Sequence, residues 1–273
     1  MTKPIKRRDM LTGLTGFGLG SLLSFSLIDR ETKAAETPSE EIDLWKYAKI
    51  DPIKVADLAY ELYPDGACMY ATVRALLTAV AEALRPTDPI AASVVYGFPF
   101  QMMKYGHAGI GMVGSTCGTF NGAAAVIGLF VKDATRRDLM IQELATYYES
   151  TELPKYKPND DKFPSMQQVM SQSVLCHVSS TRWRTTADVQ MFSPKRAERC
   201  RRLSADIAAK TAELLNRDHA DKQCTFMGLL QPTATCFDCH GTKDGMQADS
   251  IGKMNCASCH QHDETHSNKY LNK

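Results

Sequence analysis

The sequence has little excess charge of either sign, and it contains no run of residues in which apolar and polar side chains alternate. Its 273 residues include 32 Lys and Arg against 31 Asp and Glu, a formal net charge of +1. Proteins that bind nucleic acid or an anionic membrane surface carry concentrated positive charge, so this balance argues against both partners. Apolar residues recur mainly at helical spacing, which predicts a mainly α fold.

The first 35 residues have the pattern of an export signal. A Lys-Arg-Arg cluster at residues 6–8 precedes an apolar stretch at residues 10–28 and an Ala-Ala pair at residues 34–35. This order is typical of a twin-arginine signal peptide, so we expect a periplasmic protein. The alternative is an uncleaved membrane anchor, but Gly, Ser and Thr make the stretch a poor span. Once the signal is removed, 26 basic and 28 acidic residues remain, and we expect no stable membrane insertion.

Two C-x-x-C-H motifs lie within the last forty residues, CFDCH at 236–240 and CASCH at 256–260. Each is the attachment signature of a c-type haem, in which two thiols bond to the porphyrin and the adjoining histidine binds the iron. A four-cysteine zinc site is the alternative, because the spacing between the pairs allows one. Zinc would not require a histidine after each second cysteine, so we expect two haem c groups. The attaching thiols would be Cys236, Cys239, Cys256 and Cys259, and the iron ligands His240 and His260.

Five further histidines could supply the second axial ligand of each haem iron, and no methionine occupies a position that singles it out. Bis-histidine ligation leaves no open site on the iron and suits electron transfer. We favour His177, which adjoins a cysteine, and His266, with His219 in reserve. A solvated or core histidine remains the alternative for each. The remaining two are His107 and His262.

The chain divides into three predicted segments: the signal peptide (1–35), a helical redox domain (36–217) and a dihaem c segment (218–273). The last segment has few aliphatic residues, so haem packing must supply its core. The fold class is therefore a helical bundle domain with a C-terminal, loop-rich dihaem segment. The expected elements are helices at 52–62 (ended by Pro64), 65–84, 122–131, 133–148 and from Ser193-Pro194 to about Asn216, with a surface loop at 153–164.

The last of these helices shows one apolar stripe, made of Ala197, Cys200, Leu203, Ile207, Leu214 and Leu215.

Four cysteines upstream of the haem motifs form a second group: Cys68, Cys117, Cys176 and Cys200. They could be buried thiols or disulfides, which an exported protein permits. Haem c is attached after export, whereas an iron–sulfur cluster is built in the cytoplasm and must be exported inside a folded protein. The twin-arginine signal therefore favours an iron–sulfur cluster, for which four thiolates are the usual ligand set. Seven glycines surround Cys117 and permit close backbone approach.

The order of these pieces resembles a known family. The segments around Cys68, GSTCGTFNGAAAVIGL (114–129), LCHVSSTRW (175–183) and ERCRRLSADIAAKTAELLN (198–216) are similar to the redox-active C-GCAxxG-C-C proteins. With the dihaem tail, residues 50–265 resemble split-Soret cytochromes c. The resemblance implies a homodimer with two haems per chain grouped at one end and an iron–sulfur centre in the helical part. The chain departs from the pattern at Thr119-Phe120 and carries an extra thiol, Cys224, to which we assign no role.

These features predict a periplasmic electron-transfer protein with redox protein partners and no group acting as acid, base or nucleophile. One alternative is a reductase that acts on a small molecule at the cluster or at an open haem, against which the spare histidines argue. A zinc-binding interaction module is the other alternative, and the export signal and both trailing histidines argue against it.

Overall fold

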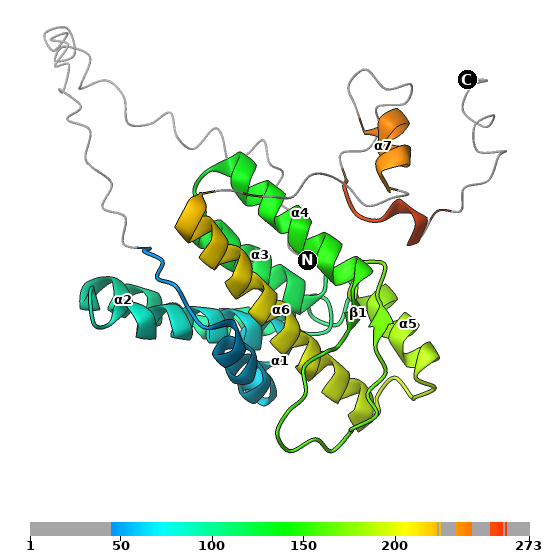
Figure 1. Ribbon diagram of the computed structural model, residues 1–273. Helices are drawn as coiled ribbons and strands as arrows, with labels where there is room; N and C mark the ends of the chain where they lie inside the picture. The colour runs from blue at the N-terminus through cyan, green and yellow to red at the C-terminus, as the bar shows by residue number, and fades with distance from the viewer. Residues whose placement is uncertain (1–44, 223, 225–232, 242–251, 259, 261–273) are drawn as a thin grey trace, which may run out of the picture. The chain divides into compact units, whose positions relative to one another are not determined.

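The chain is mainly helical in the part that the computed structural model describes, which comprises residues 45–222, 224, 233–241, 252–258 and 260 (Figure 1). Two strands of two residues each form a small antiparallel sheet. The mainly helical prediction is therefore confirmed. In chain order the elements are α1 (Pro52–Leu84), α2 (Pro89–Tyr96), η1 (Phe100–Gly106), α3 (Gly118–Phe130), α4 (Ala134–Ser150), β1 (Glu152–Leu153), β2 (Val169–Met170), α5 (Cys176–Thr186), α6 (Pro194–Asp221), α7 (Thr233–His240) and η2 (Cys256–Ser258).

Helix α1 differs from the two separate helices that the sequence predicted. Asp51 caps its N-terminus by accepting a hydrogen bond from the Ile53 backbone N–H at 2.9 Å, and proline at the first position has no N–H that needs a partner. Helical geometry continues past Pro64 and breaks at Gly66 and Ala67, after which it resumes. The predicted stop at Pro64 is therefore wrong by two residues, and the break is a kink within one element.

Helix α6 begins where the sequence predicted and ends later. The Ser193 hydroxyl accepts a hydrogen bond from the Arg196 backbone N–H at 3.2 Å, as an N-cap should. The helix ends at Asp221, five residues beyond Asn216, and Lys222 follows with a left-handed φ of 52°. Most of the predicted stripe is buried, but Ala197 is exposed.

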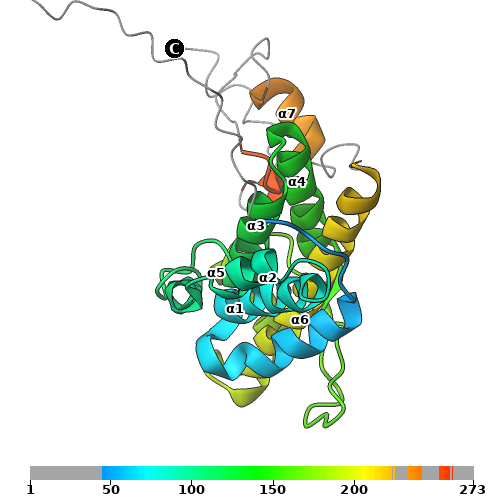
Figure 2. The same cartoon turned by 90° about the vertical axis from the view of Figure 1, so that its left-hand side faces the viewer.

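The helices pack around α1 and α6, which lie along each other over much of their length (Figures 1 and 2). Helix α3 contacts both of them, α4 packs on α3 and α6, and α2 and η1 cover another side of α1. Their apolar faces meet in one core whose fully buried members include Leu76, Leu77, Ile127, Met140, Leu144 and Leu203. Since burying a large aliphatic side chain contributes about 1.5–3 kcal/mol, this core holds α6 firmly against α1.

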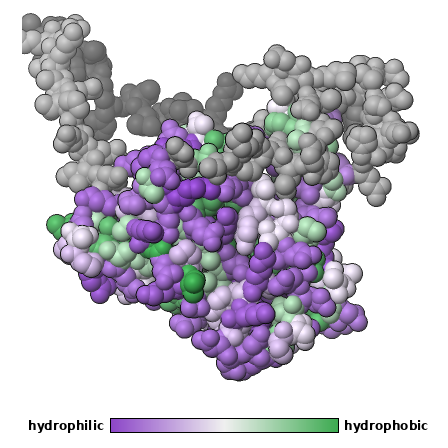
Figure 3. All heavy atoms as spheres, in the orientation of Figure 1, coloured by the Kyte–Doolittle hydropathy of each residue, from purple (hydrophilic) through white to green (hydrophobic). Residues whose placement is uncertain are grey.

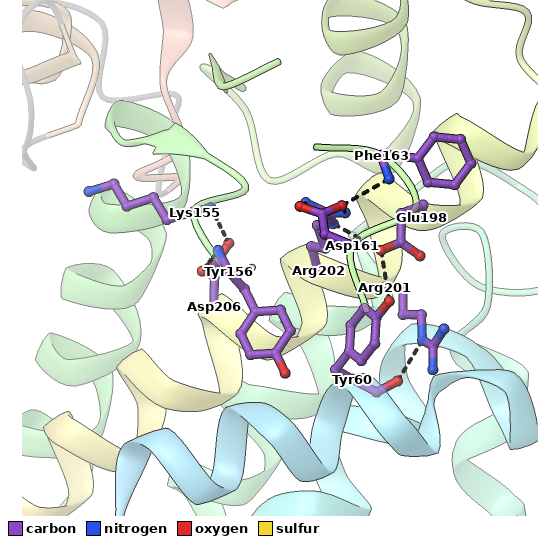
Figure 4. A network of polar contacts seen from close by, with 9 residues as sticks. All are labelled: Tyr60, Lys155, Tyr156, Asp161, Phe163, Glu198, Arg201, Arg202 and Asp206. Atoms are coloured by element: carbon purple, nitrogen blue, oxygen red, sulfur yellow. Dashed lines mark hydrogen bonds and ion pairs between the residues drawn. The ribbon is translucent and has the colours of Figure 1, made fainter. Parts of the chain in front are cut away.

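The irregular segment at residues 154–163 is fastened to α6 by buried charges (Figure 4). The Asp206 carboxylate accepts hydrogen bonds from the backbone N–H groups of Lys155, at 2.8 Å, and Tyr156, at 2.9 Å. One turn away, the buried Arg202 guanidinium pairs with Asp161 and Glu198. These contacts fix the segment on the outer side of the helix that carries Cys200.

The face of the molecule in Figure 3 is mostly hydrophilic, with hydrophobic residues scattered singly or in small groups. Within the described residues, α1 is the one helix long and apolar enough to cross a membrane, and 67% of its most apolar stretch is buried inside the protein. That burial is what a core helix of a globular protein requires.

Candidate metal centre and haem-attachment segment

The four upstream cysteines line a single cavity of about 180 Å³. They come from four regions far apart in the sequence, and their exposed fractions are 4% to 8%. The cavity volume is several times the ~30 Å³ of a water molecule. The remaining lining residues are Tyr63, Ala67, His107, Ala108, Thr119, Tyr148, Ser180, Arg196, Arg199 and Leu203.

Cys68 reaches the cavity because α1 breaks directly before it. Ala67 has φ 60° and ψ −161°, a conformation that is essentially reserved for glycine. Holding alanine there costs of order 1–3 kcal/mol, and such strain persists only where the surrounding structure enforces it. The break directs the chain so that helical geometry resumes at Cys68.

Cys117 and Cys176 lie side by side because two loops pair next to them. Cys117 is the N-cap residue of α3 and donates its N–H to the Val174 carbonyl at 2.8 Å. Cys176 is the first residue of α5 and donates its N–H to the Ser115 carbonyl at 2.7 Å. Both thiols therefore lie at helix N-termini, where unpaired N–H groups and the helix dipole stabilise negative charge.

Gly109 allows the loop after η1 to approach this pair. Its φ is +72°, and a Cβ atom built on it would lie 2.8 Å from the Cys176 Cβ atom. The sequence prediction that glycine permits close backbone approach near Cys117 fits this position. The next residue but one, Gly111, also has a positive φ but faces open space.

The thiols influence one another electrostatically. Burial raises the pKa of Cys68 well above its usual range, and the neighbouring thiols of Cys117, Cys200 and Cys176 raise it further, while the Ala108 N–H acts in the opposite direction. Burial, followed by Cys117 and Cys200, raises the pKa of Cys176 to about 11. Without metal these two groups are therefore protonated at neutral pH.

Among the described residues no three His, Cys, Asp or Glu side chains are close enough to hold one metal ion. The four cavity cysteines are also free of disulfides. A single ion needs its thiolates within one coordination shell, with Zn–S distances of about 2.3 Å, whereas a polynuclear cluster accepts thiolates on several metal atoms. Four convergent thiols, two of them at helix N-termini, fit an iron–sulfur cluster, for which four thiolates are the usual ligand set.

The two haem motifs also approach each other. Helix α7 carries Cys236 and His240 one turn apart, and η2 begins at Cys256. Burial and then the adjacent Cys236 thiol raise the pKa of Cys256. His260 is described but belongs to no helix, and Cys259 lies outside the described residues, as does the Cys239 side chain. Cys236 and Cys256 are free thiols in the structure and fit the chemistry of haem attachment.

Of the candidate distal histidines, His177 and His219 are not among the residues that line the cavity, and His266 lies outside the described residues. His177 and His219 are exposed, and His219 packs edge-on against Tyr47 with ring centroids 5.4 Å apart. His107, which is not among the favoured candidates for an axial ligand, lines the cysteine cavity. His262 and His266 lie outside the described residues, as does the predicted signal peptide.

Two arginines at the cavity, Arg196 and Arg199, were not predicted from the sequence. Arg196 and Arg199 precede Cys200 by four residues and one, which puts all three on one side of α6. The spacing of these arginines, four residues and one residue before Cys200, is the sequence signal that could have indicated a shared helix side. Arginine is rarely buried, however, and the predicted apolar stripe contains Ala197 in their place.

Fold and site together define a helical redox-type protein with a buried tetrathiol cavity and a C-terminal pair of haem-attachment motifs. Over residues 70–214 the chain matches the family described as "Putative redox-active protein (C_GCAxxG_C_C)". It is 31% identical over 286 residues to the split-Soret cytochrome c of Desulfovibrio desulfuricans (strain ATCC 27774 / DSM 6949 / MB), covering 98% of this chain and 99% of the relative.

A solved structure of the split-Soret cytochrome c from Desulfovibrio desulfuricans ATCC 27774, in which a novel iron centre is described, matches with a TM-score of 0.72. The sequence identity is 30%, and the match covers 84% of this chain and 95% of that chain. The chain therefore belongs to the split-Soret cytochrome c family.

Proposed function

We propose that this protein is a periplasmic electron-transfer protein that carries two haem c groups and one iron–sulfur centre per chain. The observation that carries the proposal is the convergence of Cys68, Cys117, Cys176 and Cys200 on one buried cavity. The two C-x-x-C-H motifs supply the haem sites, and the relative's described iron centre supports the assignment of iron to the cavity.

The residues have separate tasks in this proposal. Cys236, Cys239, Cys256 and Cys259 attach the haems, His240 and His260 bind the irons, and the cavity cysteines hold the cluster. Both kinds of cofactor supply one-electron redox chemistry when bound. The protein excludes water from the cavity thiols, whose exposed fractions do not exceed 8%, and sets the surrounding charge.

Assembly and location are part of the proposal. A haem-bearing tail with few aliphatic residues must bury porphyrin faces, and a second copy offers an isologous surface for them, so we infer a homodimer. The twin-arginine pattern supports export of a folded, cluster-bearing chain. The balanced charge supports redox proteins as partners, in preference to nucleic acid or a membrane.

One set of measurements on the purified protein tests this function. Mass spectrometry of the denatured chain should show two haem additions, and iron analysis should exceed two per chain with acid-labile sulfide present. Light scattering at micromolar concentration should give the dimer mass. A chain without haem, or with zinc in its place, would contradict the proposal, and a five-coordinate haem spectrum would favour a small-molecule reductase.

A further inference from the structure

Four of the five arginines of α6 fall into two groups that differ in what they pair with. On the outer side, the Arg202 and Arg217 guanidiniums pair with carboxylates, and Arg202 is drawn in Figure 4. On the cavity side, the hydrogen bonds of Arg196 and Arg199 go to neutral groups in the part of the chain that the structure describes. The Asp206 carboxyl interacts electrostatically with Arg199, but its hydrogen bonds come from the backbone N–H groups of Lys155 and Tyr156. Arg196 donates to the Ser180 hydroxyl at 3.2 Å, and Arg199 donates to the Ser179 hydroxyl at 2.7 Å and to the Cys200 Sγ atom at 3.9 Å.

Arg199 is the extreme case, since its side chain is buried and 2% of the residue is exposed. Its Nε atom, like that of Arg196, is buried and has no hydrogen-bond partner among the described residues. Burial of a guanidinium is unfavourable because its hydration is lost, and the two hydrogen bonds of Arg199 to neutral groups replace that hydration only in part. The positive charge at this wall of the cavity therefore calls for an anion inside it.

Among the described residues that line the cavity, none carries a carboxylate that could supply that anion. Iron binding changes the charge, because four thiolates bring more negative charge than an iron–sulfur core neutralises. The bound centre is then an anion that faces two arginines and the N-termini of α3 and α5.

We propose that Arg199, assisted by Arg196, is the counter-charge of the cysteine-held iron centre and raises its reduction potential. This inference rests on the function proposed above. Reduction adds one negative charge to the centre, and a buried positive charge at the cavity wall stabilises the reduced form. Because the site is shielded from water, salt does not screen this interaction effectively. Arg199 is thus a positioning and tuning residue and undergoes no chemistry itself.

The test compares midpoint potentials of the holoprotein, measured by redox titration followed by electron paramagnetic resonance. Arg199→Gln removes the charge, and Arg199→Lys keeps it without the planar fork. Arg201→Gln is the matched control, because this neighbouring guanidinium donates to the Tyr60 carbonyl at 2.8 Å, away from the cavity. We expect the potential of the iron–sulfur centre in Arg199→Gln to fall by at least about 59 mV, a tenfold change in the reduction equilibrium.

The potential of the iron–sulfur centre should fall by less in Arg199→Lys and should equal the wild-type value in Arg201→Gln. Both haem potentials should stay unchanged in all three variants. The shift should persist at high salt. An Arg199→Gln protein that contains the cluster at wild-type potential would overturn the inference. Loss of sulfide in Arg199→Gln but not in Arg199→Lys or Arg201→Gln would support it, as a requirement for the charge in assembly.

If both Arg199 variants lose sulfide, Arg196→Gln decides the matter: a lowered potential supports the inference and an unchanged one overturns it. Wild-type protein without acid-labile sulfide would be a failure of the proposed function, and the inference would fall with it. Sulfide and iron are therefore counted before any potential is compared.

Discussion

Thr116 and Leu175 pair through an isolated antiparallel bridge, and this pairing explains why the next residue after each is a cavity cysteine. From there the chain turns directly into α3 on one side and α5 on the other. Two thiols that are 59 residues apart in the sequence thereby share one rim of the cavity. The backbone pairing thus brings together two thiols that a shared cluster would need as ligands.

If the four cavity cysteines hold the cluster together, each should be indispensable. We expect replacement of Cys68, Cys117, Cys176 or Cys200 by serine to abolish acid-labile sulfide and its iron while mass spectrometry still shows both haems. Cys224→Ser is the matched control, because Cys224 contacts Glu143 outside the cavity. Retention of sulfide in the Cys→Ser variants would mean that the thiols are structural.

The strained residue before Cys68, Ala67, predicts that a glycine substitution stabilises the protein, although glycine within a helix usually destabilises it. Ala67→Gly should raise the free energy of unfolding by about 1–2 kcal/mol, because glycine adopts this conformation without the strain. Ala79→Gly, in the regular part of α1, should lower it by about 1 kcal/mol. Urea unfolding followed by circular dichroism measures both. A loss of stability in both variants would show that Ala67 is not strained.

The starts of α1 and α6 could be predicted from the sequence because their signals are local. The caps Asp51 and Ser193 and the three- and four-residue apolar spacing depend only on neighbouring residues, and the structure agrees with them. The four cysteines could be chosen as candidate cluster ligands because cysteine thiolates are the usual ligands of iron–sulfur clusters. The order of the segments that carry them, which resembles the C-GCAxxG-C-C proteins, supported that choice.

The cavity wall could not be predicted in the same way. The burial of Arg199 depends on four segments meeting in space, and its residue type argued for the surface. The sequence predicts the end of the helix at Pro64, because proline is the usual local cause of a helix end. The observed break is at Gly66 and Ala67, where tertiary packing imposes a φ of 60° on Ala67. Local rules therefore failed at the residues around the cavity.

Asp206 should make folding stability depend on pH. Burial raises the pKa of this carboxyl to about 6, although the N–H groups of Lys155 and Tyr156 lower it in part. Well below the ordinary aspartate pKa of about 4 the group is protonated in both the folded and unfolded states, and above pH 6 the folded state must hold a buried carboxylate. Relative to Asp206→Asn, the wild type should therefore lose stability between pH 4 and pH 6.

The loss should be up to about 3 kcal/mol, since one pKa unit corresponds to about 1.4 kcal/mol. Urea midpoints of both proteins, measured at pH 4 and pH 6.5, give the difference directly. Parallel behaviour of the two proteins across this range would contradict the raised pKa of Asp206.

Substitutions at two glycines in the loop after η1 can distinguish the effect of backbone strain from the effect of close approach to the metal site. Gly109 and Gly111 both have left-handed φ values, +72° and +56°, so alanine at either position should cost about 1–2 kcal/mol in stability. An alanine Cβ at Gly109 would also press on the Cys176 side chain, while at Gly111 it would meet nothing within 4 Å. We expect both variants to unfold at lower urea concentration, but Gly109→Ala alone to lose sulfide or to change the electron paramagnetic resonance spectrum of the reduced centre. The two substitutions differ in that only an alanine Cβ at Gly109 would contact Cys176 and the backbone at Gly114 and Ser115. Equal cofactor content and identical spectra in the two variants would therefore show that the loop is not part of the cluster site.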